Sequence, residues 1–97
     1  MLNSKQRAYL MSLAANLEPV VQVGKSGVSP ETIDSLEEAF HTRELLKVNI
    51  QKTSPDEPAL AGDKLYKRSH SELVKVIGRK VVLYRPFREN QKIELPK

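Results

Sequence analysis

Hydrophobic residues recur with two different periods along this chain, and the changes of period divide it into helices and strands. Spacings of three to four residues predict helices, while alternation and β-branched runs predict strands. The resulting order, α-β-α-β-α-β-β, predicts one α/β domain around a mixed four-stranded sheet. The expected helices cover 4–17, 30–42 and about 58–70, and the expected strands cover 20–23, 44–51, 73–77 and 81–85.

The first expected helix has a plausible beginning, an apolar face and an end. Ser4 can cap its N-terminus, and Pro19 follows it and prevents its continuation. Four apolar residues fall on one side at helical spacing and are expected to be buried. They are Leu10, Leu13, Ala14 and Leu17.

The second half of the chain gives weaker helix signals and a clear hairpin. Pro58 and Gly62 interrupt the third expected helix, and a glycine there costs about 1 kcal/mol relative to alanine. Gly78 can supply the positive φ of a tight turn between the last two strands. The polar segment from about residue 87 is expected to be loosely held, although Ile93 and Leu95 could add a short edge strand.

Length and composition suggest a small soluble protein. The 97 residues are enough for one domain (1–97) with a modest core, and the absence of cysteine excludes disulfides and thiolate metal sites. The N-terminus lacks the apolar run of a signal peptide, and no segment approaches membrane-spanning length. We therefore expect a cytoplasmic protein, a monomer, with no membrane partner.

Charge is unevenly distributed along the chain, although the net charge is only +4. Residues 31–42 carry a net charge of −4, whereas residues 71–97 carry +4. Acidic residues thus gather in one expected helix and basic residues elsewhere. Such an arrangement is typical of a protein that binds a polyanion on one side and is acidic on the opposite side.

The turn from Gly24 to Gly27 is the strongest candidate for a binding site. It lies between an expected strand and a helix that Ser29 can cap and Pro30 can begin. Two glycines would allow a ligand close to the backbone, beside Lys25, Ser26 and the positive end of the helix dipole. A phosphate suits this place, which in a basic chain indicates nucleic acid.

Two other interpretations of this turn need to be considered. A connection between strand and helix needs a flexible residue for structural reasons alone, so the motif by itself leaves that interpretation open. A nucleotide-binding P-loop is excluded, because the first glycine of that motif would fall on Pro19.

Three blocks of the sequence resemble the signature blocks of the CRM domain, in particular the stand-alone bacterial YhbY type. The blocks are Pro19 to Val28, Glu44 to Val48 and Val76 to Pro86. The resemblance implies an RNA-binding domain, similar in fold to the C-terminal domain of bacterial translation initiation factor three. It further implies association with precursors of the large ribosomal subunit and a role in ribosome assembly.

The expected ligand is therefore RNA, namely large-subunit rRNA or its precursor particle. We expect no cofactor and no small-molecule substrate. Neither histidine lies beside a serine motif or a paired carboxylate, so nothing indicates an enzyme. The candidate RNA-binding residues are Gly24, Lys25, Ser26 and Gly27 in the turn, with Lys5, Arg7, Arg79, Lys80 and Arg85 around it.

A function of another class remains open at this point. The acidic helix from Glu31 to Glu38 could bind a partner protein, which would make the chain an interaction adaptor with only incidental RNA binding.

Overall fold

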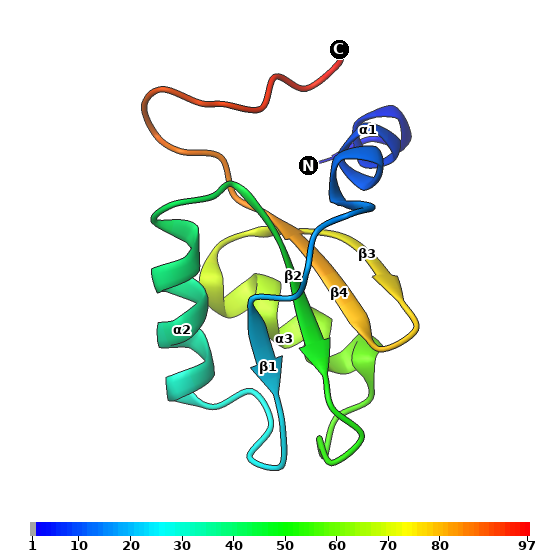
Figure 1. The fold of residues 1–97 in the computed structure, drawn as a ribbon, viewed down its shortest axis with the longest axis vertical. Coiled ribbons are helices and arrows are strands. Elements are labelled where there is room, and N and C mark those ends of the chain that lie inside the picture. Colours follow the sequence, from blue (N-terminus) through cyan, green and yellow to red (C-terminus); the bar gives the residue numbers. More distant parts are fainter. Residues whose placement is uncertain (1) are drawn as a thin grey trace.

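A computed structural model describes residues 2–97 and confirms the expected order of elements (Figure 1). Within these residues, none of the helices has the length and apolar character that crossing a membrane requires. The elements are α1 (Ser4–Ala14), β1 (Val21–Val23), α2 (Pro30–Phe40), β2 (Leu45–Ile50), α3 (Pro58–Ser69), β3 (Glu72–Ile77) and β4 (Lys80–Tyr84).

The strands form the expected mixed four-stranded sheet, in the order β1-β2-β4-β3. β1 runs parallel to β2, with Val21 opposite Val48, whereas β4 is antiparallel to both of its neighbours. The register between β3 and β4 shifts once, between Leu73 and Lys75. The parallel pair is separated along the chain by α2, as the strand-helix-strand pattern predicted.

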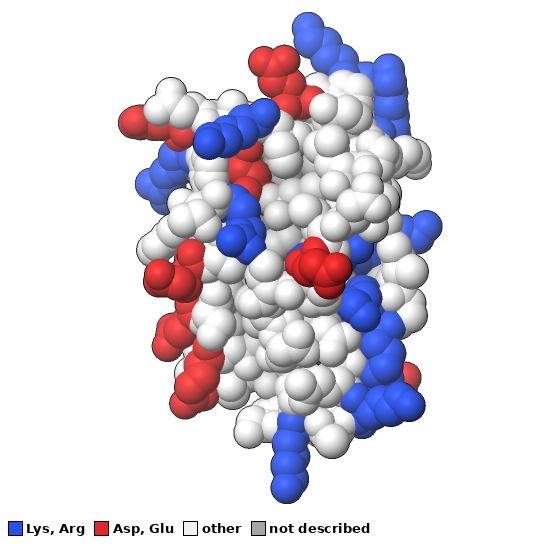
Figure 2. All heavy atoms as spheres, in the orientation of Figure 1, with Lys and Arg blue, Asp and Glu red and all other residues white. Residues whose placement is uncertain are grey.

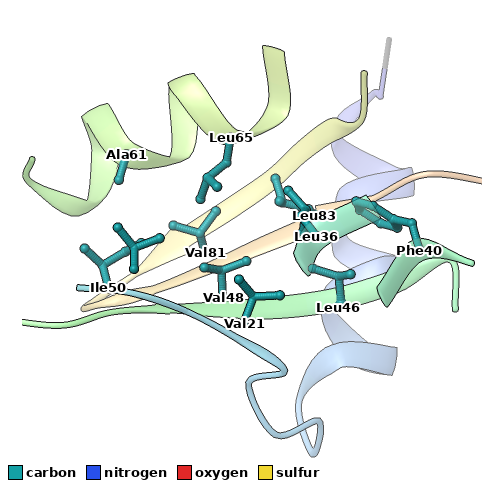
Figure 3. Close-up of a cluster of buried hydrophobic side chains, with 11 residues drawn as sticks. Val21, Leu36, Phe40, Leu46, Val48, Ile50, Ala61, Leu65, Val81 and Leu83 are labelled. Atoms are coloured by element: carbon teal, nitrogen blue, oxygen red, sulfur yellow. The ribbon is translucent and has the colours of Figure 1, made fainter. Parts of the chain in front are cut away.

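The main core lies between one face of the sheet and the helices α2 and α3. Side chains from β2 and β4, such as Val48 and Val81, meet Leu36 of α2 and Leu65 of α3 (Figure 3). All four are fully buried. Each such side chain contributes about 1.5–3 kcal/mol on burial, so this face fixes both helices on the sheet.

The opposite face of the sheet is covered by α1, but only at the end where β2 begins and β4 ends (Figure 1). Leu10 and Ala14 of α1 pack there in one cluster with Leu45, Val82 and Tyr84. Burial raises the pKa of Tyr84, and the nearby Glu44 carboxylate adds to the shift. In the described part of the chain, no helix lies over the outward side chains nearer the other end of the sheet (Figure 1).

The first helix differs from the expectation at both ends. Asn3, not Ser4, is the N-cap: its side chain accepts a hydrogen bond from Gln6 N at 2.8 Å, and the Gln6 side chain accepts one from Asn3 N at 3.1 Å. Together these bonds form a capping box. The helix ends at Ala14, and the predicted burial of Leu13 and Leu17 is wrong, since they are 41% and 39% exposed.

The third helix is continuous despite Pro58 and Gly62. Pro58 lies in its first turn, where a proline removes no helical hydrogen bond. Gly62 is buried, and a Cβ atom there would lie 3.4 Å from both Cγ atoms of Val81. Helix α3 therefore lies close over β4 at this position, where a methyl group would just make van der Waals contact.

Glu44, immediately before β2, binds the segment that follows β4. Its carboxylate is buried and accepts hydrogen bonds from the backbone N–H groups of Phe87, Lys92 and Ile93, at 2.7–2.9 Å. Ile93 and Leu95 form no strand but pack against the cluster beneath α1. Hydrogen bonds to a charged acceptor are worth about 1.5–3 kcal/mol each, so one carboxylate organises this segment.

Candidate nucleic-acid interface

Three connections meet at one end of the sheet (Figure 1). They are the turn at Gly24–Gly27 after β1, the connection of residues 51–57 after β2, and the hairpin turn at Gly78–Arg79. The parallel pairing of β1 and β2 brings the first two together, because parallel strands end at the same edge. A hydrogen bond from Gln51 N to Val23 O, 2.8 Å long, joins them.

The turn at Gly24–Gly27 is closed by a backbone hydrogen bond between its two glycines, and Pro55 packs against it. Gly27 N donates to Gly24 O at 2.9 Å, and Gly27 has φ +69°, a conformation that favours glycine. Gly27 is buried, and a Cβ atom there would lie 3.1 Å from Pro55 Cγ. The structure therefore gives Gly27 a role in folding. This agrees with the interpretation that a connection between strand and helix needs a flexible residue.

Gly24 is also close to the neighbouring connection. A Cβ atom at Gly24 would lie 2.7 Å from Oε1 of Gln51, the end of a flexible side chain. The two residues between the glycines, Lys25 and Ser26, are both exposed at the tip. They are the part of the turn that a ligand can reach.

Helix α2 begins directly after this turn, as predicted. Ser29 Oγ accepts a hydrogen bond from Thr32 N at 3.3 Å, and Pro30 lies in the first turn of the helix. The Thr32 hydroxyl donates to Gly27 O at 3.3 Å and so ties the helix to the turn. The positive end of the helix dipole thus lies beside Lys25 and Ser26, which favours an anion there.

Arg68 of α3 strengthens this end of α2. Its Nη1 donates to Val28 O at 2.9 Å, and its side chain is otherwise exposed. The guanidinium therefore adds a positive charge next to the turn. No local pattern in the sequence predicts this contact, because Arg68 and Val28 are 40 residues apart.

The uncovered part of the sheet, which we call the open half-face, carries polar and basic side chains beside the turn. Cross-strand pairing places one row of residues across all four strands. Lys47 and Lys75 lie in the next row, each paired with Val82, which is buried under α1, so this row borders the covered part of the sheet. The row that crosses the whole sheet consists of Gln22, Asn49, Lys80 and Ile77.

Charge is largely segregated between the two sides of the molecule, although one acidic side chain lies near the centre of the face that Figure 2 shows. Lys and Arg side chains run down the side formed by β3 and β4, and a basic group lies at the lower tip, where Figure 1 shows the turn after β1. Acidic side chains follow α2 on the opposite side. An extended polyanion would thus meet attraction along the open half-face and repulsion along α2.

Arg79, a predicted RNA contact, is engaged with the sheet. Its Nε and Nη2 donate to the carbonyl oxygens of Ile50 and Gln51, at 2.6 and 2.7 Å. The side chain therefore fastens the hairpin turn to the end of β2 while remaining partly exposed. Lys80, its neighbour, begins β4 on the open half-face. Arg79 and Lys80 thus lie at the same end of the sheet as the turn.

The other predicted contacts lie farther from the turn. Lys5 and Arg7 are exposed on α1, and Arg7 lines a cavity of about 380 Å³ together with Lys75 of β3. Arg7 thus adjoins the edge of the open half-face.

Arg85 is not brought together with the turn. Its Nη1 lies 2.9 Å from both carboxylate oxygens of Glu37 in α2 and 3.0 Å from Ser69 O. Its guanidinium also lies over the Phe40 ring, 4.6 Å from the centroid. The acidic helix thus neutralises Arg85.

Comparison with known proteins adds an independent finding. Residues 2–85 match the CRS1 / YhbY (CRM) domain family. The chain belongs to this family. The predicted resemblance is thereby confirmed.

Two relatives match nearly the whole chain. The Probable RNA-binding protein YqeI of Bacillus subtilis is 42% identical over 99% of this chain and 100% of its own length. A protein of Haemophilus influenzae named RNA-binding protein is 33% identical, over 99% of this chain and 96% of its own length. The solution structure of the hypothetical protein SAV1595 from Staphylococcus aureus has a TM-score of 0.84 and 41% identity, and the match covers 99% of this chain and 100% of that one.

We predict that the two glycines with positive φ differ in their tolerance of alanine. Gly27→Ala should destabilise this CRM domain by about 2–3 kcal/mol, because it combines backbone strain with the contact to Pro55. Gly78→Ala, with φ +56° and nothing within 4 Å of the new Cβ, should cost only the strain, about 1 kcal/mol. Urea unfolding of both variants tests this, and equal losses would show that the packing against Pro55 contributes nothing.

Proposed function

We propose that this CRM domain binds RNA through the tip of the turn, Lys25 and Ser26, together with the open half-face. The observation that carries the proposal is that both features lie on one side of the molecule, with the acids of α2 on the other (Figures 1 and 2). A phosphate at the tip would lie beside the positive end of the α2 dipole and meet the charge of Lys25. The names of YqeI and the Haemophilus influenzae relative support RNA as the ligand.

The role of each residue in this surface follows from whether its side chain is exposed. Lys25 neutralises a phosphate and Ser26 forms a hydrogen bond with it, since both side chains are exposed. Gly24 and Gly27 hold the turn in the shape that presents them. Lys80 and Arg79 extend the positive surface at the same end of the sheet, and Arg7 and Lys5 extend it on α1.

The RNA that we propose is rRNA of the large ribosomal subunit in a precursor particle, and the function is to aid assembly of that subunit. The support for this step is the resemblance of the three sequence blocks to the stand-alone YhbY type of CRM domain, together with the match of YqeI over its full length.

Replacing the tip should abolish most RNA binding without unfolding the domain. In Lys25→Asp/Ser26→Asp two exposed residues become acidic, so affinity for a structured RNA should fall about tenfold or more, because 1.4 kcal/mol corresponds to tenfold and a charged hydrogen bond is worth at least that. The slope of log affinity against log salt should also decrease by about 1, for the lost lysine–phosphate contact.

The matched control is Arg88→Asp/Gln91→Asp, which makes the same change in charge at exposed positions after β4. It should lose much less affinity than the tip variant, and circular dichroism should show both variants folded. Equal losses in the two variants would mean that only net charge matters and that the tip is not a binding site.

Sedimentation of a lysate tests the proposed role in assembly. At low salt the wild-type protein should co-sediment with immature large-subunit particles, and the Lys25→Asp/Ser26→Asp variant should move toward the free fraction, because its phosphate contacts are lost. A wild-type protein that runs free of all ribosomal particles would contradict the assembly role and leave RNA binding alone.

The acidic helix supports one competing function, that of a protein-interaction adaptor. Glu31, Asp34 and Glu38 are exposed along α2, on the side away from the open half-face. A partner held by this helix would stay bound after ribonuclease treatment of a pull-down, whereas a partner held through RNA would be released.

A further inference from the structure

We propose that the open half-face binds helical, A-form RNA, and that Gln22 and Asn49 recognise its 2′-hydroxyl groups. This inference rests on the proposed function and specifies the form of RNA that this part of the surface accepts. It depends on three features of the described residues: the positions of the aromatic side chains, the amides in the row that crosses the whole sheet, and the lysines beside these amides.

Among residues 2–97, no aromatic side chain lies on the open half-face. The chain has five aromatic residues. Phe40 is buried in the main core and Tyr84 is buried under α1. Tyr66 packs against the main core from α3, Tyr9 lies on α1, and Phe87 lies beyond β4.

This distribution argues against unpaired bases as the ligand of the sheet. Proteins hold single-stranded RNA largely by stacking bases on aromatic rings, worth about 1–3 kcal/mol per base. The open half-face has no ring to offer, so it suits a ligand whose bases are already stacked on one another and whose backbone faces outward. A-form helical RNA meets this requirement.

The row that crosses the whole sheet carries a pair of amides that can recognise a hydroxyl group. Asn49 Nδ2 donates to Gln22 Oε1 at 2.7 Å, across the parallel pair of strands. This bond leaves Nε2 of Gln22 and Oδ1 of Asn49 as a neighbouring donor and acceptor on the surface. A 2′-hydroxyl both donates and accepts, and it is the group that distinguishes RNA from DNA.

Two lysines lie beside the amide pair, at positions from which they can reach phosphates along the edge of a groove. Lys80 lies opposite Asn49 on β4, and Lys47 lies two residues away on β2, where its Nζ donates to Ala15 O at 3.5 Å, a long bond that a phosphate can replace. With strands about 4.8 Å apart and a rise of about 3.3 Å per residue, these lysines are about 8 Å apart at Cα. The full row across four strands spans about 14 Å.

Such a surface matches one groove of A-form RNA better than the other. The minor groove is wide and shallow and displays the 2′-hydroxyls, whereas the major groove is too deep and narrow for side chains to read. A sheet with short amides at its centre and long lysines beside them can approach a shallow groove. Ile77, 44% exposed at the end of the row, adds apolar contact with the sugars.

The test compares three ligands of one sequence: a 16-base-pair RNA duplex, its unstructured single strand, and the corresponding DNA duplex. The wild-type protein should bind the RNA duplex about tenfold more tightly than either of the others. Lys47→Gln/Lys80→Gln should weaken binding to both duplexes and reduce the salt slope by about 2, one for each lost phosphate contact.

The amide pair is tested by Gln22→Ala/Asn49→Ala, which should remove most of the preference for RNA over DNA while leaving the salt slope unchanged. Gln22→Val/Asn49→Val repeats the test with residues that favour strands, in case the alanine variant is less stable. Lys92→Gln/Lys97→Gln, with both lysines exposed beyond β4, is the control for the loss of two lysines in Lys47→Gln/Lys80→Gln.

The possible outcomes of these measurements test different parts of the proposal. Equal or tighter binding of the single strand would overturn the inference and leave the proposed function intact. An RNA-to-DNA ratio unchanged in both amide variants would overturn the role of Gln22 and Asn49. Binding to none of the RNA ligands would overturn the proposed function itself.

Discussion

β2 is the element on which both the core and the candidate site depend, because its side chains alternate between the two faces of the sheet. Leu46, Val48 and Ile50 point into the core shared with α2 and α3, while Lys47 and Asn49 lie on the open half-face. Its parallel pairing with β1 brings the Gly24–Gly27 turn and the connection after β2 to one edge of the sheet. A shift of one residue in this register would exchange the two faces, so the buried residues also determine which polar side chains meet a ligand.

The packing at that edge explains why the glycines and the exposed residues of the turn have different roles. Pro55 lies under Gly27, and the Thr32 hydroxyl binds Gly27 O, so the turn is held between the connection and the first turn of α2. Only Lys25 and Ser26 project from it. The acids farther along α2 oppose an anion on that side, which limits a phosphate to the tip. Turn and open half-face together form one surface of suitable charge for RNA.

How far the sequence alone could predict these features depends on whether local or distant residues determine them. The cap at Ser29, the start of α2 at Pro30 and the positive φ of Gly78 were predicted correctly, since each depends on neighbouring residues. The partners of Arg79 and Arg85 were not predicted, because they lie 16 to 48 residues away. Lys47 and Lys75 were missed as parts of one surface, since only the strand register aligns them. Leu13 is exposed because Leu10 and Ala14 are the residues of α1 that are buried against the sheet.

The central claim, that one side of the domain binds RNA while α2 does not, is tested most directly by NMR. Amide spectra of the ¹⁵N-labelled protein would be recorded during titration with a structured RNA at low salt. The account predicts that shifts and line broadening concentrate at residues 24–27 and at Gln22, Asn49 and Lys80. The amides of residues 34–40, on the acidic helix beyond its first turn, should change little. Changes centred on the exposed face of α2, with residues 25 and 26 unaffected, would contradict the account.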